Sequence, residues 1–255
     1  MRKSPRKNKH RTMQPLVLAL CVLLLPTTLR AEGASAAELL AKMRAVFGPE
    51  TDCYAHLTVS RAGDRGRPAG EFIYLRSDAR RSGLLYQVFP ADVLGYAFLY
   101  VAKDLMAYNP ACLCSQAAEA EALVRRFGVS FAELDPRSLG GLAVREEART
   151  GFLDGQAVFV IGLQSEAPGE TLDVYLSAST LLPLRRQTRD ASGKITRTVD
   201  YPGYYEAGGC YIPRRMTIAA PGVPRLAVTV DDLSLRPLPD FVFTRSYLEE
   251  LSPAE

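Results

Sequence analysis

Cysteine and histidine are the residues of this chain that could bind a metal or carry redox chemistry, and there are few of them. Beyond residue 31 the chain has four cysteines, Cys53, Cys112, Cys114 and Cys210, and one histidine, His56. The Cys-x-Cys spacing differs from the Cys-x-x-Cys of zinc knuckles and redox helices, and a single histidine gives a metal too few ligands. We therefore expect no metal site and no cofactor. Structural disulfides among the four cysteines are the favoured interpretation in an oxidising compartment, with free or buried thiols as the alternative.

Common catalytic motifs are missing from the sequence. It contains no Gly-x-Ser-x-Gly elbow, no Gly-x-Gly-x-x-Gly loop, no P-loop and no His-Glu-x-x-His. His56 falls on the polar side of a predicted strand, where a lone histidine is usually a surface residue. Adjacent acidic residues on a strand point to opposite faces and make poor acid/base pairs, so we interpret them as solvated charge. The sequence predicts that the protein is not an enzyme.

Pairs of adjacent arginines are the other candidate binding residues in this sequence, because guanidinium groups bind carboxylates and phosphates. On a strand, a doublet points one guanidinium outward and the other inward or to a rim. Exposed strands with salt bridges are one interpretation, and a basic rim that meets lipid headgroups or an acidic partner surface is the other. The doublets are Arg80-Arg81, Arg125-Arg126, Arg185-Arg186 and Arg214-Arg215.

The first 36 residues have the order of a secretory signal peptide. A basic segment without acids precedes an apolar core that is too short to span a bilayer, and small residues follow. We expect cleavage after Ala31 or Ala36 and export to the periplasm. An uncleaved anchor, which would leave the protein membrane-associated, is the alternative. A lipoprotein signal ending at Cys21 is a lesser option, because Leu20 is bulky where a small residue is needed.

The charge of the chain depends on this segment. The whole sequence has 31 basic and 28 acidic residues, and seven basic residues and no acid lie in residues 1–31. The remainder has 24 basic against 28 acidic residues, a net charge of −4. A nucleic-acid partner is therefore not expected.

Periodicity predicts one domain over residues 37–255. The stretch SAAELLAKMRAVFG has helical spacing, with Ser35 as a cap and Gly48 as a terminator. Alternating apolar residues then indicate many antiparallel strands. We expect a mainly β fold with α: a strongly curved antiparallel sheet, an incomplete β-barrel of roughly ten strands. The N-terminal helix and a short helical lid at Val129–Leu139 would cover it, because so long a meander cannot remain flat.

The stretch YAFLYVAKDLMAY predicts a hairpin that is apolar on both faces. One face belongs in the core. The other faces either a covering helix or a cavity that holds something apolar, and both alternatives are open on the pattern alone. If a cavity exists, we expect inward-facing strand residues to line it: Leu57, Val59, Ile73, Leu75, Phe98, Tyr100, Leu172, Val174, Leu176, Ile218, Val228 and Val230.

The stretch LLYQVFPADVLGYAFLYVAKDLMAYNPA resembles a segment of the outer-membrane lipoprotein-sorting family, the LolA-like and LolB-like proteins. There a strand ends in a Pro-Ala-Asp-x-x-Gly turn, and an apolar hairpin follows that closes on Tyr-x-Pro. Further stretches, among them SFAELDPRSL and FLDGQAVFVIGLQSE, are similar to that family in the same order, over roughly residues 37–251. The chain departs from the family pattern at ACLCSQAAEAEALVRRFGV, with Cys-x-Cys and a helix-like Ala/Glu run.

The resemblance implies an incomplete barrel with a helical lid over an apolar cavity. It implies a non-catalytic periplasmic carrier for lipoprotein acyl chains or other lipids, moving them toward the outer membrane. Its partners would be an inner-membrane donor complex and an outer-membrane acceptor. An acyl chain of about 14–16 carbons at about 0.8 kcal/mol per methylene would give about 11–13 kcal/mol before binding costs. A surface-exposed, adhesin-like interaction module on the same scaffold is the alternative, and a lipid-cleaving enzyme that uses His56 is a third hypothesis.

Overall fold

The computed structural model describes residues 34–62, 68–90, 95–165 and 167–251. The basic segment and apolar core of the predicted signal peptide, and most of the Pro-Ala-Asp turn, lie outside these residues. No helix in the described part of the chain is long and apolar enough to cross a membrane.

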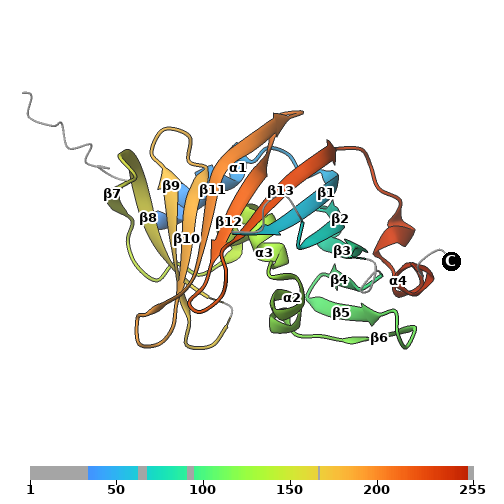
Figure 1. Ribbon diagram of the computed structural model, residues 1–255. Helices are drawn as coiled ribbons and strands as arrows, with labels where there is room; N and C mark the ends of the chain where they lie inside the picture. Colours follow the sequence, from blue (N-terminus) through green and yellow to red (C-terminus); the bar gives the residue numbers. More distant parts are fainter. Residues whose placement is uncertain (1–33, 63–67, 91–94, 166, 252–255) are drawn as a thin grey trace, which may run out of the picture. The chain divides into compact units, whose positions relative to one another are not determined.

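A single antiparallel sheet contains all the strands of the described residues (Figure 1). The strands are β1 (Asp52–Arg61), β2 (Gly70–Ser77), β3 (Ser82–Phe89), β4 (Ala97–Val101), β5 (Asp104–Asn109), β6 (Cys114–Ala117), β7 (Arg149–Leu153), β8 (Gln156–Gln164), β9 (Thr171–Ser177), β10 (Pro183–Arg189), β11 (Ile195–Ala207), β12 (Cys210–Ala219) and β13 (Leu226–Ser234).

The sheet consists of two meanders joined at one place. Its order is β6-β5-β4-β3-β2-β1-β13-β12-β11-β10-β9-β8-β7, so every neighbour is consecutive in the chain except β1 and β13. Those two strands pair in register from Leu57 with Val230 to Arg61 with Leu226. The sheet does not close, because β6 and β7 remain as its two edges. The predicted curved antiparallel sheet is confirmed, with thirteen strands where we expected roughly ten.

Helices begin where the sequence provides caps. In α1 (Ala36–Val46), the Ser35 hydroxyl accepts from the Glu38 N–H and the Glu38 carboxylate accepts from the Ser35 N–H. Ser130 and Glu133 repeat this capping box at α3 (Phe131–Leu134). The other helical segments are α2 (Ala120–Phe127), η2 (Pro136–Gly141), η3 (Asp240–Phe243) and α4 (Arg245–Glu250).

The helices divide the core into three clusters. The α1 cluster packs Leu39, Leu40 and Met43 against β8 and β9. The central cluster places α2 and the segment around α3 on β1–β4 and β11–β13. The C-terminal cluster packs η3 and α4 on the opposite face of β2–β5. The predicted N-terminal helix and the predicted short helical segment near Val129–Leu139 are therefore both confirmed as covering elements.

The hairpin of β4 and β5 is apolar on both faces because protein covers both. The Phe98 ring meets the Phe127 ring of α2 edge-on, with centroids 5.1 Å apart. Its neighbour Leu99 points to the other side, into the cluster that contains Phe243 and Leu248. Of the two alternatives, burial by covering helices accounts for most of this hairpin.

Candidate ligand pocket

A pocket of about 360 Å³ lies between the β4–β6 end of the sheet and α2. Cross-strand pairing explains its floor: Phe98 is opposite Ala107 and Ala107 is opposite Gln116, so these three side chains form one row on the α2 side. Asn109, two residues beyond Ala107, lies on the same face. The full lining is Tyr96, Phe98, Ala107, Tyr108, Asn109, Gln116, Ala122, Arg125 and Arg126. The Tyr108 ring belongs to the C-terminal cluster on the other face.

Helix α2 forms the opposite wall. Ala122, Arg125 and Arg126 are three and four residues apart, so they share one face of the helix. Leu123 and Phe127 are buried in the central cluster instead. Gly128 ends the helix with a φ of +74°, a conformation that glycine adopts without strain. The sequence pattern of α2 thus separates a packing face from a face that borders the pocket.

The two arginines of this wall have no described acidic partner. The guanidinium carbon of Arg126 lies 3.8 Å from the centre of the Tyr96 ring, which is a cation–π stack. No ion pair joins Arg125 or Arg126 to a carboxylate in the part of the chain that the structure describes, and this includes Glu121, one turn before Arg125. The pocket therefore combines an apolar floor with two cations at one border.

The other doublets differ. Arg80 forms ion pairs with Asp52 and Asp240, and Arg185 pairs with Asp200. One arginine of each of these doublets thus forms salt bridges, although Arg80-Arg81 lies in the turn between β2 and β3 and not on a strand. Arg214 lies over the Tyr205 ring at 5.5 Å, away from the pocket. The Arg125-Arg126 doublet, in contrast, borders the pocket.

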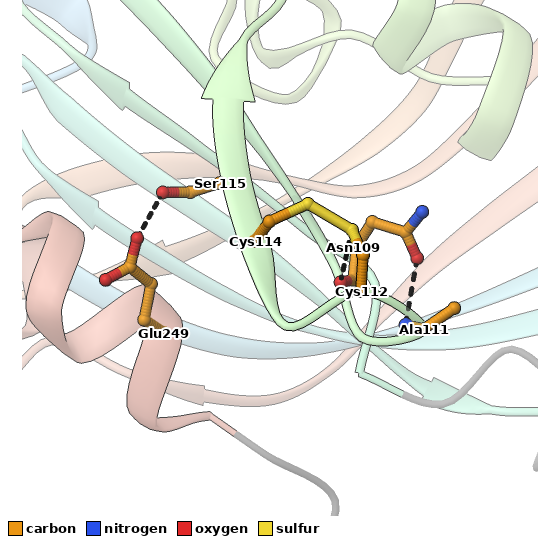
Figure 2. Close-up of a disulfide and its surroundings, with 6 residues drawn as sticks. All are labelled: Asn109, Ala111, Cys112, Cys114, Ser115 and Glu249. Carbon is orange, nitrogen blue, oxygen red and sulfur yellow. Dashed lines mark hydrogen bonds between the residues drawn. A yellow bond between two sulfur atoms is a disulfide. The ribbon is translucent and has the colours of Figure 1, made fainter.

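A disulfide closes the turn beside the polar end of the pocket (Figure 2). It joins Cys112 to Cys114, and Cys114 pairs across the strands with Asn109 of the pocket lining. The neighbouring Ser115 hydroxyl points the other way and bonds to the Glu249 carboxylate of α4. The turn therefore connects the pocket on one face with the C-terminal helix on the other.

Buried charges anchor the segment that follows α2. The Arg197 guanidinium of β11 donates to the Glu133 carboxylate of α3 and to the Gly128 carbonyl at 2.7 Å. Arg186 donates to the Ala132 carbonyl at 2.9 Å, and the Tyr201 hydroxyl donates to the Glu133 carbonyl. Burial alone would raise the pKa of Glu133, but the hydrogen bond and charge of Arg197 outweigh it and hold that pKa below its ordinary value.

The residues predicted to line a cavity are distributed over all three clusters. Phe98 lies in the lining of the pocket. The others pack against protein: Leu57, Val59, Ile218, Val228 and Val230 in the central cluster, Leu172, Val174 and Leu176 in the α1 cluster, and Leu75 with Ile73 in the C-terminal cluster. The Tyr100 ring contacts the Phe131 ring, with centroids 6.1 Å apart and the planes tilted by 33°. Sequence reasoning missed the arginines of α2 and the amides of Asn109 and Gln116 as pocket residues, although the Arg doublet itself was visible.

The disulfide prediction requires a correction. Cys112 and Cys114 are bonded, but Cys53 and Cys210 are free and buried. They lie on β1 and β12 with β13 between them, so two strand spacings of about 4.8 Å separate them, beyond the roughly 7 Å that a disulfide can span. Burial raises the pKa of the Cys53 thiol to about 11, which keeps it in the neutral form.

His56 has an ordinary structural environment. Its Nε2 atom lies 3.5 Å from a carboxylate oxygen of Glu71 on the neighbouring strand. Within the described residues, no group of three or more His, Cys, Asp or Glu side chains is placed to hold a metal ion.

The described residues form an open, curved antiparallel sheet with helices on both of its faces, and this is the fold of solved lipoprotein-sorting structures. No protein-family model matches the sequence, and no curated protein matches it significantly. The fold is nevertheless shared with several solved structures, which confirms the resemblance seen in the sequence at the level of the fold.

Three of these structures align with most of the chain. A DUF1329 family protein from Desulfovibrio piger is 17% identical, with a TM-score of 0.68, and covers 84% of this chain and 97% of its own. A protein from Vibrio parahaemolyticus, described as an outer membrane lipoprotein-sorting protein domain, is 17% identical, with a TM-score of 0.70 and the same coverages. A LolA superfamily protein from Nitrosomonas europaea is 18% identical, with a TM-score of 0.69, and covers 84% and 99%.

Proposed function

We propose that this protein is a non-catalytic carrier that binds the acyl chain of a lipid or lipoprotein in the pocket under α2. One observation carries the proposal: an apolar floor of Phe98 and Ala107 faces the apolar Ala122 of a covering helix across about 360 Å³. Ligand pockets occupy roughly 300–1,000 Å³ and are mostly apolar with a few polar groups. The volume suits one chain, or part of one, rather than several.

The packing of side chains around the pocket suggests how cargo would enter and leave it. Beside the pocket, side chains of the central cluster, among them Leu123 and Phe127, fill the rest of the space between the sheet and α2. A longer chain could enter only if α2 moved away from the sheet. Methylenes of the cargo would then replace the side chains that now cover the sheet, so the apolar surface uncovered by opening would be buried again by binding.

The cellular setting belongs to the same proposal. A signal peptide would export the chain to the periplasm, where a lipid must be shielded from water between two membranes. An inner-membrane donor complex and an outer-membrane acceptor are the partners that such a route requires. The similar folds of lipoprotein-sorting proteins support this setting.

The test is a binding measurement on protein purified after export. A fluorescent fatty-acyl probe should bind and be displaced by unlabelled fatty acid, and native mass spectrometry should detect co-purified lipid. Ala122→Leu adds three carbons to the pocket and should weaken probe binding about tenfold by steric exclusion. Ala120→Leu, on the same helix but exposed and outside the lining, is the matched control and should bind as the wild type does. A wild-type protein that neither retains lipid nor binds the probe would rule the proposal out.

A further inference from the structure

The charged border of the pocket suggests which lipid it takes. Arg125 and Arg126 project from the pocket face of α2, next to the apolar floor. Two adjacent guanidinium groups without a described carboxylate partner create a positive potential at that border, while the chain after the signal peptide has a net charge of −4. The basic character is therefore local to the pocket and does not reflect an overall excess of positive charge.

The stack of Arg126 on Tyr96 prepares this arginine to bind an anion. The guanidinium carbon lies over the ring, 3.8 Å from its centre, so the ring covers one side of the group. Its N–H groups lie in the guanidinium plane and remain available to donate to oxygen atoms. The stack also restricts the side chain, so less conformational entropy is lost when an anion binds.

Two amide side chains in the pocket lining add further hydrogen-bond donors for a headgroup. Asn109 and Gln116 bring amide groups to the same pocket, and both can donate to oxygen atoms of a headgroup. The lining therefore changes from Phe98 and Ala107, which suit methylenes, to amides and guanidinium groups, which suit an oxygen-rich anion. An amphiphile presents these two chemistries within one molecule.

We propose that the pocket selects a single-chain amphiphile with a phosphate headgroup, the phosphate binding to Arg125 and Arg126 and the chain lying on the Phe98–Ala107 floor. This inference rests on the proposed carrier function and adds the headgroup class. Phosphate oxygens suit the arginines because guanidinium groups donate paired hydrogen bonds to them.

Three probes that share either the acyl chain or the phosphate group separate the contribution of the headgroup to binding from that of the chain. These are 1-palmitoyl-glycerol 3-phosphate, 1-palmitoyl-glycerol with the same chain but no phosphate, and glycerol 3-phosphate with no chain. Binding is measured by displacement of a fluorescent acyl probe and by native mass spectrometry. We expect the wild type to prefer the acylated phosphate over the uncharged acylglycerol about tenfold, an advantage that decreases with added salt. Glycerol 3-phosphate alone should bind far more weakly.

Variants assign the preference to the arginines. The double variant Arg125→Gln, Arg126→Gln should lose the preference while its affinity for the uncharged acylglycerol stays within about twofold, and Arg125→Lys, Arg126→Lys should keep part of it. The control is Arg214→Gln, Arg215→Gln, an exposed doublet that also has one arginine over a tyrosine ring but lies away from the pocket. The control should keep the full preference.

The outcomes distinguish the two proposals. Equal wild-type affinity for charged and uncharged acylglycerol would overturn the headgroup inference and leave the carrier function standing. Tight binding of glycerol 3-phosphate alone would also overturn the inference, because the site would then take a free phosphate. If no acylated probe binds, both proposals fail.

Discussion

Gly48 is the residue at which the end of α1 meets the turn between β11 and β12. Its φ is +83°, and a Cβ added there would lie 2.1 Å from the Gly209 carbonyl oxygen. The contact is with backbone and cannot be relieved by rotating a side chain. The Tyr211 N–H also donates to the Phe47 carbonyl beside it, so this position fixes the end of α1 against the sheet.

Replacement of Gly48 by alanine should therefore be strongly destabilising. Gly155 has the same φ of +83° but has no atom within 4 Å of an added Cβ, so it is a matched control. We expect Gly155→Ala to lower the free energy of unfolding by about 1 kcal/mol, the cost of the left-handed conformation. Gly48→Ala should lower it by at least about 3 kcal/mol, because the backbone must also move. Urea denaturation measures both, and equal losses would contradict the role given to the Gly209 contact.

Individual residues show how far the sequence alone could go. Ser35 as the cap of the first helix and Gly48 as its end were predictable, because both act on neighbouring backbone. The partners that each Arg doublet contacts could not be predicted, because the doublets look alike in sequence. Arg80 meets Asp52 and Asp240, which are 28 and 160 positions away, and only the packed structure decides such pairings.

At the scale of elements, α3 depends on a charge interaction with β11. Glu133 is 2% exposed and accepts from Arg197, whose side chain is 20% exposed, so an uncharged replacement would leave a largely buried guanidinium without its counter-charge. Removing one partner of a buried pair typically costs about 3–5 kcal/mol. Loss of the Glu133 charge should therefore weaken the attachment of α3 to β11. It should also weaken the attachment of the end of α2, which Arg197 contacts through the Gly128 carbonyl.

Glu133→Gln should lower the free energy of unfolding by about 3 kcal/mol at pH 7. The pKa of Glu133 is lowered in the folded state, so the stability it contributes is present above its ordinary value of 4.5 and is lost as the pH falls below it. The difference between variant and wild type should therefore narrow in acid. Urea denaturation at pH 7 and at pH values below 4.5 measures this. Glu146→Gln, which breaks an exposed ion pair with Arg145, is the control and should cost less than about 1 kcal/mol.

Individual helices and strands were easier to predict from the sequence than the pairing of strands in the sheet. The alternation of Leu172, Val174 and Leu176 indicated a strand, and β9 is that strand, although Asp173 and Ser177 on its other face are buried as well. The Ala/Glu run indicated a helix, and part of it forms α2. The short strand β6 was missed because four residues that include Cys114 carry no alternating pattern. The pairing of β1 with β13 has no local signature, so the sequence could not show where the two meanders join.

At the scale of the whole molecule, the start of the mature chain affects the fold. Ala36 is 1% exposed in the α1 cluster, and Ser35 caps the helix. Cleavage after Ala31 would keep both residues, whereas cleavage after Ala36 would remove them. Cleavage after Ala36 would also place a charged amino group at the positive end of the helix dipole, which is unfavourable.

We therefore predict that the exported protein begins at Glu32. Intact-mass measurement of the purified protein should give the mass of residues 32–255, and a mass for residues 37–255 would contradict the prediction. A version expressed from Ala37 should be less stable than the longer one by about 1 kcal/mol from the lost cap alone. Thermal unfolding of the two versions side by side measures this.

The junction of the two meanders has a consequence for how the chain comes to be folded. Thr58 and Asp231, which bond across β1 and β13, are 173 positions apart. The first meander cannot gain its partner strand until nearly the whole polypeptide has left the ribosome, and contacts so distant in sequence form slowly. A chain that stays unfolded while it is being synthesised can still be threaded through a narrow export channel. For an exported protein, as proposed above, the late-forming junction would thus delay folding until the chain has passed through such a channel.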